Sequence, residues 1–425
     1  MKVCVAGLWH LGTVTAACLA AGGHLVTGWD ADSETIARLQ RNEPPVFEPG
    51  LAELVARGAG EGRLRFTTDA AEALRDAEIV WVAYDTPVDD DDKADVGFVL
   101  RSVASLLPHV RDGALVLISS QLPVGSTRSL EERAAGRDIT FAYSPENLRL
   151  GKAIDVFSHP DRVVAGVRHE QDRARISALL EPFTDRIEWM SVESAEMTKH
   201  ALNAFLAMSV AFINEIAAIC EQVGADAREV ERGLRSEQRI GPKAYLGPGG
   251  AFAGGTLARD VVFLSGLGRE HGIPTNLISS VKASNDAHRG WAGRRLRELL
   301  GDLAGARVAV WGLTYKPGTD TLRRSSSVEL CSWLVAQKAR VAAHDPAVKS
   351  LELDGVELCA TALDAAREAE ALVVMTEWPD YKSIDGDSIA EALTGRRLVL
   401  DANRFLAPQL AAHPRVVYAT VGKAV

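Results

Sequence analysis

Residues 3–30, VCVAGLWHLGTVTAACLAAGGHLVTGWD, contain the alternation from which the fold class follows. The run Val3–Ala6 is short, apolar and rich in β-branched residues, which is typical of a buried strand. A glycine-bounded turn and a stretch of small helix-forming residues follow, and the next apolar run ends at Asp30. Strand, turn, helix and strand in this order predict a βαβ unit with parallel strands.

The turn after the first strand carries most of a dinucleotide-binding fingerprint. In such a unit the first glycine makes the turn, the third lets helix and strand pack closely, and an acidic residue about 20 positions later binds the ribose 2′-hydroxyl. Gly7, Gly12 and Asp30 meet these demands, whereas Trp9 stands in place of the second glycine. We therefore predict that Gly7, Leu11, Gly12 and Asp30 contact NAD rather than NADP. The alternative is an α/β domain whose turn no longer admits a cofactor.

Two series of strands are separated by a helical region. The predicted strands are Lys2–Gly7, His24–Asp30, Ile79–Ala83, Leu115–Ser119 and Thr140–Ala142 in the first series, and Arg307–Gly312, Arg340–His344, Ala371–Met375 and Arg397–Asp401 in the second. We therefore predict an α/β fold with two Rossmann-like doubly wound domains, joined by a long central helix and a helical middle domain. The predicted domains are residues 1–192, 193–300 and 301–425.

The central helix is expected from Glu193 to about Val223, where Gly224 is a plausible C-cap. It contains no Pro or internal Gly and is apolar over much of its circumference. A helix of this kind is buried, and burial against a second copy of the chain is the expected form. The sequence therefore predicts a homodimer formed through this helix.

Composition narrows the class of protein. A length of 425 residues predicts two or three domains, and a net charge of −10 argues against a nucleic-acid or anionic-membrane surface. We expect no membrane helix and no signal peptide. The five cysteines are scattered and lack CxxC spacing, which predicts free buried thiols, no metal site and a reducing compartment, the cytoplasm.

Ordered motifs along nearly the whole chain carry a family resemblance. They are Glu48–Leu51 (EPGL), Thr86-Pro87, Pro123–Gly125, Tyr143–Arg149 (YSPENLR), Phe212–Glu215, Pro248–Asp260 (PGGAFAGGTLARD) and Gly312–Pro317 (GLTYKP). In these segments the chain resembles the UDP-glucose/GDP-mannose (nucleotide-sugar) 6-dehydrogenase family. The resemblance implies an NAD-dependent oxidoreductase that acts on the C6 primary alcohol of a nucleotide sugar, in polysaccharide or secondary-metabolite biosynthesis. It assigns NAD to the first domain, dimerisation to the second and the nucleotide sugar to the third.

The resemblance also assigns the site residues. It implies catalytic roles for Lys199, Asn203, Asp260, Glu146 and Thr256. It implies cofactor contacts for Gly7, Leu11, Gly12, Asp30, Thr86, Pro87, Gln121, Arg259 and Arg323. It implies substrate contacts for Arg239, Tyr245, Gly249, Phe252 and Lys316, with Arg239 reaching the substrate of the second subunit. Lys199 and Asn203 are four residues apart, so they share one helical face.

Thr256 occupies the position of the family's catalytic cysteine. A thiol with a pKa of about 8.5 supplies some thiolate near neutrality and attacks an aldehyde, whereas a threonine hydroxyl is not ionised unaided. We therefore expect the oxidation of a UDP-glucose-like substrate to stop at the aldehyde. One alternative is full four-electron oxidation to the uronate through the aldehyde hydrate, with Glu146 assisting.

The chain departs from the family at further positions, of which the resemblance places Asp85, Gln121 and Leu150 near the cofactor, together with Trp9. Asp85 replaces a glycine, Gln121 a threonine, Leu150 a glutamate and Arg259 a lysine, while Asn and Arg appear exchanged at 403–404. With Trp9 and Asp85 they leave open a third reading, a nucleotide-binding homologue without redox activity or a dehydrogenase of a non-sugar phosphate ester.

Overall fold

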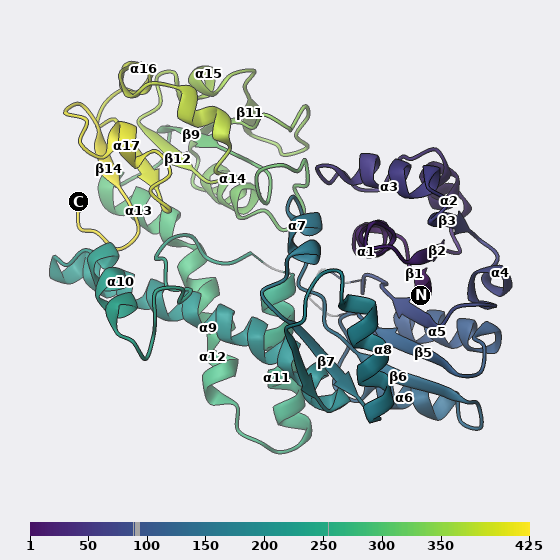
Figure 1. Ribbon diagram of the computed structural model, residues 1–425. Helices are drawn as coiled ribbons and strands as arrows, with labels where there is room; N and C mark the ends of the chain where they lie inside the picture. The colour runs from purple at the N-terminus through teal and green to yellow at the C-terminus, as the bar shows by residue number, and fades with distance from the viewer. Residues whose placement is uncertain (88, 90–93, 254) are drawn as a thin grey trace. The chain divides into compact units, whose positions relative to one another are not determined.

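The computed structural model describes residues 1–425 except 88, 90–93 and 254. It divides into two compact units, Met1–Leu202 and Asn203–Val425, each with its own sheet (Figure 1). The division into three domains that the sequence predicts is a finer one and remains a prediction. The expected fold class, α/β with two Rossmann-like parts and a long central helix, is confirmed.

Unit 1 is built on an eight-stranded sheet of order β3-β2-β1-β4-β5-β6-β7-β8. All neighbouring strands run parallel except β6 and β7, which are antiparallel. The strands are β1 Lys2–Ala6, β2 Leu25–Trp29, β3 Leu64–Thr67, β4 Ile79–Val82, β5 Ala114–Ile118, β6 Ile139–Tyr143, β7 Val163–Val167 and β8 Ile187–Met190. The strand order reverses between β1 and β4, where a doubly wound sheet binds its ligand.

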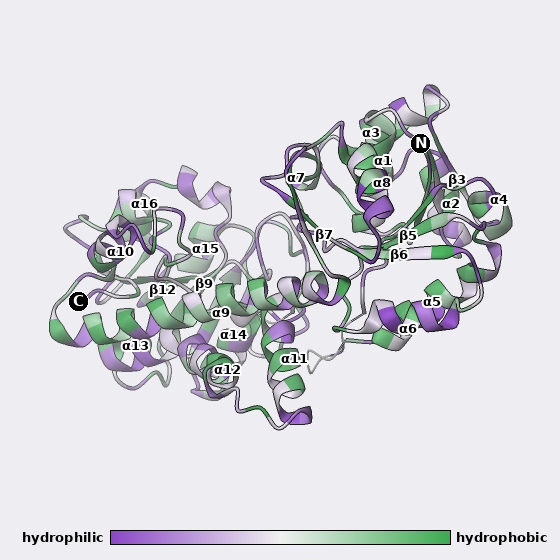
Figure 2. Cartoon of the chain, turned by 60° about the horizontal axis from the view of Figure 1, so that its bottom comes forward, coloured by the Kyte–Doolittle hydropathy of each residue, from purple (hydrophilic) through white to green (hydrophobic). Residues whose placement is uncertain are grey.

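Helices cover both faces of this sheet. They are α1 His10–Ala21, α2 Ser33–Gln40, α3 Leu51–Gly60, α4 Ala70–Leu74, α5 Val96–Leu106, η1 Leu107–His109, α6 Ser126–Arg133, α7 Ala153–Ser158 and α8 Glu170–Leu180. Alternate residues of β1 point to opposite faces, so Val3 and Val5 join the core under α1 while Cys4 and Ala6 join the core under α5. Figure 2 shows α1 and α8 on one side of the sheet and α5 and α6 on the other.

Helix α9, Val192–Val223, is the long central helix, and Gly224 follows it with φ of +77°. We expected no membrane helix, and α9 is the one helix among the described residues that is long and apolar enough to cross a membrane by length and composition alone. An 18-residue window of α9 has mean hydropathy 1.7 with at most two charged residues. Only 44% of that window is buried in the chain, and the core helices of soluble proteins meet the same criterion.

Unit 2 contains a six-stranded parallel sheet of order β11-β10-β9-β12-β13-β14. Its strands are β9 Arg307–Trp311, β10 Arg340–His344, β11 Val356–Leu358, β12 Ala371–Val374, β13 Leu398–Asp401 and β14 Val417–Ala419. Its helices after α9 are α10 Ala227–Ser236, α11 Thr256–Glu270, α12 Asn276–Arg289, α13 Trp291–Leu300, α14 Ser326–Ala336, α15 Ala362–Ala366, η2 Pro379–Ser383, α16 Gly386–Ala392 and α17 Ala407–Leu410. Apolar residues of α9, α13 and α14 pack on one face, and those of α15 and α16 on the other.

Candidate active site

The turn between β1 and α1 has the backbone geometry of a dinucleotide cradle. Gly7 adopts φ of +90°, and a Cβ there would lie 2.6 Å from Tyr84 Cδ1. A Cβ on Gly12 would lie 1.7 Å from the carbonyl oxygen of Gly7. Both positions therefore exclude any side chain, and the exclusion leaves the N-terminus of α1 open to a phosphate.

Asp30 fixes this turn from the end of β2. Its Oδ2 accepts a hydrogen bond from the backbone N–H of Leu8 at 2.7 Å, and its Oδ1 accepts one from Asp32 N–H at 3.0 Å. Each carboxylate oxygen keeps a lone pair for a ribose hydroxyl. Trp9 occupies the N-cap of α1 and is 54% exposed, so its side chain is not part of the core beneath the turn. These residues fit NAD.

The other predicted cofactor residues of unit 1 follow β4 and β5. The Thr86 hydroxyl is buried and donates to the Gln121 carbonyl at 2.8 Å, which ties the two loops together. Asp85 and Pro87 are exposed on either side of Thr86. The departures Asp85 and Gln121 therefore lie on one linked pair of loops at the carboxyl edge of the sheet.

Lys199 is buried in unit 1 by the loop that follows β6. Its Nζ donates to the carbonyl oxygen of Glu146 at 2.6 Å and to Asn147 Oδ1 at 3.4 Å. The residue is only 7% exposed. The Glu146 side chain accepts from Leu148 N–H at 2.7 Å. The structure thus brings Lys199 and Glu146, both predicted site residues, together with Asn147. The Lys199 ammonium is bonded to neutral oxygen atoms of the other two.

Two buried carboxylates that were not among the predicted site residues hold these loops. Glu48, of the EPGL motif, accepts from Gly151 N–H at 2.7 Å and from Ala153 N–H at 2.8 Å. Burial opposes its ionisation, yet these backbone donors and His10 lower its pKa below the usual range. The carboxylate therefore anchors the segment between Glu146 and α7.

The second buried carboxylate, Glu196, caps α6. It accepts from Gly125 N–H at 2.6 Å, from Thr127 N–H at 2.9 Å and from the Thr127 hydroxyl at 2.7 Å. An anion at a helix N-terminus satisfies donors that have no partner within the helix. One turn of α9 thus carries both Glu196 and Lys199.

In unit 2, Asn203 and Asp260 form a buried pair. Asn203 Nδ2 donates to Asp260 Oδ2, and the two residues are 4% and 0% exposed. Asn203 lies on α9 and Asp260 in the second turn of α11. The amide keeps its own carbonyl oxygen for another partner, while the carboxylate is a strong acceptor in a dry setting.

Thr256 is the first residue of α11 and is exposed. Within the described part of unit 2, its hydroxyl makes no hydrogen bond to a base. Arg259 and Asp260 follow on the same helix, while Gly254 of the same motif lies outside the described residues. The position carries the helix-start geometry that would favour a thiolate, but a hydroxyl without a base gains little from it.

All five cysteines of the chain are free thiols, four of them buried and Cys359 half-buried. Burial raises the pKa of Cys4, Cys18 and Cys331 to about 12. Burial also raises the pKa of Cys220 and of Cys359, where Glu357 adds to the effect. Raised pKa values keep these thiols protonated and unreactive at neutral pH.

The glycine-rich loop before α11 is held by amide and imidazole side chains. Gly249 N–H donates to Asn214 Oδ1 at 3.0 Å, and His288 Nε2 donates to the Gly249 carbonyl at 2.8 Å. Asn285 bonds both backbone groups of Phe252 at 2.9 Å. A Cβ on Gly249 would lie 2.1 Å from Asn403 Oδ1, so only glycine fits. Of these side chains, Asn214 and Asn403 lie at positions that the sequence singled out, whereas Asn285 and His288 do not.

Asn403 explains the apparent exchange at positions 403 and 404. Its Oδ1 accepts a hydrogen bond from Gly250 N–H at 2.7 Å, so the Asn403 side chain holds the glycine-rich loop in place. Arg404 pairs instead with Asp226 at 2.7 Å. The arginine thus has a structural partner inside unit 2 and the asparagine shapes the loop.

A cavity of unit 2 adjoins this loop, with about 1030 Å³ of space between its lining atoms, part of it open to solvent. Lys316 and Arg324 line it as cations, and Ser325 and Ser326 line it at the start of α14. A helix N-terminus with nearby cations is suited to a phosphate. Among the described residues, the lining contains Arg324 rather than the predicted Arg323.

The remaining predicted substrate residues lie on the segment before the loop. Tyr245 is 57% exposed. The Arg239 side chain is 87% exposed and bonds Glu237 at 3.0 Å. Leu150, one of the departures, is 38% exposed in unit 1. None of the three lines the unit 2 cavity.

Comparison with known proteins covers the whole chain. Three domain descriptions of the UDP-glucose/GDP-mannose dehydrogenase family match in order: the NAD binding domain over residues 1–184, the central domain over 193–287 and the UDP binding domain over 309–408. The UDP-glucose 6-dehydrogenases of Rhizobium meliloti and Pseudomonas aeruginosa are each 34% identical, over 100% of this chain and 100% and 98% of theirs.

A solved structure gives the same result. The UDP-glucose dehydrogenase of the archaeon Pyrobaculum islandicum is 29% identical and superposes with a TM-score of 0.86, over 100% of this chain and 98% of its own. The matching domains, the glycine cradle that fits NAD and the ordered motifs agree with one another. The chain therefore belongs to the UDP-glucose/GDP-mannose dehydrogenase family and is an NAD-dependent nucleotide-sugar dehydrogenase.

Proposed function

We propose that this chain oxidises the C6 primary alcohol of a UDP-glucose-like nucleotide sugar and releases the aldehyde. The observation that carries this proposal is Thr256, an exposed first residue of α11 without a base bonded to it. The relatives named above support a UDP-sugar as substrate, and the UDP binding domain supports the nucleotide.

The first oxidation needs a group that takes the hydroxyl proton and a cation or donor that stabilises the developing oxyanion. Lys199 and Asn203 are one turn apart on α9, so their spacing suits a shared role at the oxyanion. Asp260, bonded to Asn203, is the proposed proton acceptor, acting through a water. NAD, when bound, accepts the hydride that leaves C6.

In the family resemblance, the second oxidation proceeds through a covalent adduct of the aldehyde with the cysteine, from which hydride leaves. Thr256 could form that adduct only after losing its proton, and the described part of unit 2 provides no base for it. The five thiols have raised pKa values and none lies in this motif. The chemistry of these residues therefore supports one hydride transfer per sugar.

A second candidate is the four-electron oxidation through the aldehyde hydrate. A hydrate already carries the second oxygen, so hydride could leave without a covalent adduct. Glu146 favours this candidate, because its half-buried carboxylate lies beside the segment that binds Lys199 and could take the hydrate's proton.

The proposed ligand contacts follow the two units. In unit 1, Gly7, Leu11, Gly12, Asp30, Thr86, Pro87 and Gln121 are proposed for NAD, with Arg259 and Arg323 of unit 2. In unit 2, Arg239, Tyr245, Gly249, Phe252 and Lys316 are proposed for the nucleotide sugar. Because Arg324 lines the cavity, it is the better placed cation for a phosphate there.

The assembly proposed is a homodimer in the cytoplasm. Phe205, Phe212 and Ile219 recur every seven residues along α9 and are 60%, 46% and 58% exposed. An apolar stripe at this spacing is suited to packing against a symmetry-related helix. Five free thiols suit a reducing compartment.

The test is a panel of UDP-, GDP-, ADP- and CDP-sugars, in which NADH formed and sugar consumed are counted in the same sample. A hydroxylamine traps any aldehyde. The proposal expects a UDP-hexose to be used best, with trapped aldehyde as the product. Carboxylate product with two NADH per sugar would favour the hydrate candidate instead.

A further inference from the structure

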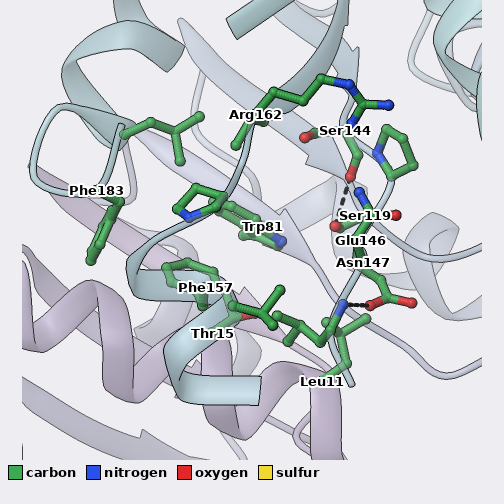
Figure 3. A pocket seen from close by; sticks show the side chains of 16 residues that line it. Leu11, Thr15, Trp81, Ser119, Ser144, Glu146, Asn147, Phe157, Arg162 and Phe183 are labelled. Atoms are coloured by element: carbon green, nitrogen blue, oxygen red, sulfur yellow. Dashed lines mark hydrogen bonds between the residues drawn. The ribbon is translucent and has the colours of Figure 1, made fainter. Parts of the chain in front are cut away.

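A separate cavity lies within unit 1, on the face of the sheet covered by α1, α7 and α8 (Figure 3). We call it the Trp81 cavity, after the indole from β4 that forms its floor. Its lining atoms enclose about 580 Å³, part of it open to solvent. Trp81 and Phe157 lie with ring centroids 6.0 Å apart, and Phe157 and Phe183 lie 5.1 Å apart. Three aromatic rings thus form a wall against which a flat molecule could pack.

Two buried polar groups in this cavity lack partners. Trp81 Nε1 and Thr15 Oγ1 make no hydrogen bond among the described residues, although their residues are 5% and 0% exposed. Leaving such a group unbonded costs about 1–3 kcal/mol. Figure 3 shows the indole nitrogen on the side of Ser119 and Asn147. Both groups can donate a hydrogen bond, and neither has an acceptor among the described residues.

Arg162 adds a third donor. It lines the cavity, is half-buried, and has no ion pair or hydrogen bond within the described part of unit 1. Figure 3 places its guanidinium at one end of the cavity, with Leu11 and Thr15 at the other. The carboxylate nearby, Glu146, already accepts from Leu148 N–H. The Arg162 guanidinium and the two neutral donors are therefore unused within the described part of unit 1, and an anion or strong acceptor at the Arg162 end would satisfy them.

We propose that the Trp81 cavity binds a small aromatic carboxylate, with its ring against Trp81 and Phe157 and its carboxylate toward Arg162. Water alone is a poor occupant, because a buried water needs two to four polar partners and these walls are largely aromatic and aliphatic. A planar carboxylate matches the two-pronged geometry of a guanidinium. This ligand is neither the NAD nor the nucleotide sugar of the proposed reaction.

The cavity is connected to the candidate active site by shared residues. Glu146 and Asn147 line it, and the same two residues accept the Lys199 ammonium. A bound carboxylate would therefore touch the loop that positions Lys199. The proposed site is thus placed to act on turnover as well as to bind.

The test uses the full-length protein with 5-fluorotryptophan at its eight tryptophans, observed by fluorine NMR. Trp81→Phe assigns the Trp81 resonance by its loss. Benzoate should move that resonance and should bind at least about tenfold more tightly than benzamide, which lacks the charge, or toluene, which lacks the acceptor. Arg162→Gln should reduce benzoate to the affinity of benzamide. The matched control Arg186→Gln removes an exposed arginine of unit 1 outside the cavity and should change nothing.

Three results would overturn the proposal. The first is that the Trp81 resonance does not move at benzoate concentrations on the order of 10 mM, which is well above the dissociation constant expected for a specific small-molecule site. The second is equal affinity for benzoate, benzamide and toluene. The third is unchanged benzoate binding in Arg162→Gln, a variant that keeps every aromatic residue and so tests the charge even if Trp81→Phe does not fold.

Discussion

Two aspartates shape equivalent turns in the two units. Asp30 accepts from Leu8 N–H at 2.7 Å, and Asp345 accepts from Leu313 N–H at the same distance. The glycine before each leucine is left-handed, with φ of +90° at Gly7 and +89° at Gly312. Each carboxylate therefore holds a phosphate-sized turn from the neighbouring strand. The two units therefore share a glycine turn that an aspartate of the neighbouring strand holds in place.

Asp30 should select NAD over NADP. A 2′-phosphate would meet the carboxylate, so the wild type should prefer NAD, and Asp30→Asn should reduce the NAD/NADP ratio of kcat/KM by at least about tenfold. The asparagine can still accept from Leu8 N–H, so the turn is kept. Asp32→Asn removes an equal charge two residues away and should leave the ratio unchanged. An unchanged ratio in Asp30→Asn would refute the assignment.

Asp345 should make the stability of unit 2 depend on acid. Burial opposes its ionisation, but the N–H groups of Thr314, Leu313 and Ala347 lower its pKa below the ordinary value of 3.8. A lowered pKa stabilises the folded state above pH 3.8, and this contribution is lost as the pH falls through the folded value. Asp345→Asn should lose about 1.5–3 kcal/mol at neutral pH and should show a smaller further loss in acid. Urea unfolding between pH 7 and pH 3 would measure both, and parallel pH curves would contradict the role.

At the scale of elements, α9 supplies polar groups to its surroundings at successive turns. Glu196 caps α6, and Lys199 and His200 bind the loops after β6 and β5, with His200 Nε2 donating to the Leu122 carbonyl at 2.9 Å. Asn203 then pairs with Asp260. The helix is therefore a support for the candidate catalytic residues as well as a core element.

Glu196→Gln tests this support. Glutamine retains one acceptor oxygen but loses the charge that faces the α6 N-terminus, so the free energy of unfolding should fall by about 1.5–3 kcal/mol. Glu132→Gln, at an exposed position of α6, should change it by less than about 0.5 kcal/mol. Chemical denaturation of both variants gives the comparison. Equal losses would show that the buried carboxylate does not cap the helix.

The elements also show what the sequence could predict. The strands of the two βαβ series and α9 were predicted to within a few residues, because their apolar runs are continuous and bounded by glycine. Strands β3, β8 and β11 were missed because a charged residue interrupts each apolar run, and β14 because it has only three residues. Strand β7 was missed although its run is apolar. The antiparallel pairing of β7 with β6 had no local signal.

In the candidate site, too, the local features could be predicted from the sequence and the long-range contacts could not. The turn of Gly7 and Asp30 is local and could be predicted. The support of the Gly249 loop could not, because Asn285, His288 and Asn403 lie 33 to 153 residues away from their partners. The choice of Arg324 over Arg323 depends on a backbone turn, with φ of +59° at Arg324, that no motif specifies.

At the scale of the whole molecule, the exposed stripe of α9 should hold two chains together. Phe205→Asp with Phe212→Asp places charges in that apolar surface, so light scattering at about micromolar concentration should give 45.6 kDa for the variant and twice that mass for the wild type. Phe47→Asp alters a phenylalanine of unit 1 that is 84% exposed and should leave the dimer intact. A wild type of 45.6 kDa would contradict the proposed assembly.

In the proposed reaction, the number of hydrides that leave each sugar depends on Thr256. Counting NADH per sugar consumed in the wild type, Thr256→Ala and Thr256→Cys is the direct measurement. The account predicts one NADH and a trappable aldehyde for the wild type. Thr256→Ala should give the same count at a rate within about tenfold, or 1.4 kcal/mol. Thr256→Cys should move the count toward two. Two NADH and a carboxylate in the wild type, lost in Thr256→Ala, would show instead that the threonine is a working nucleophile.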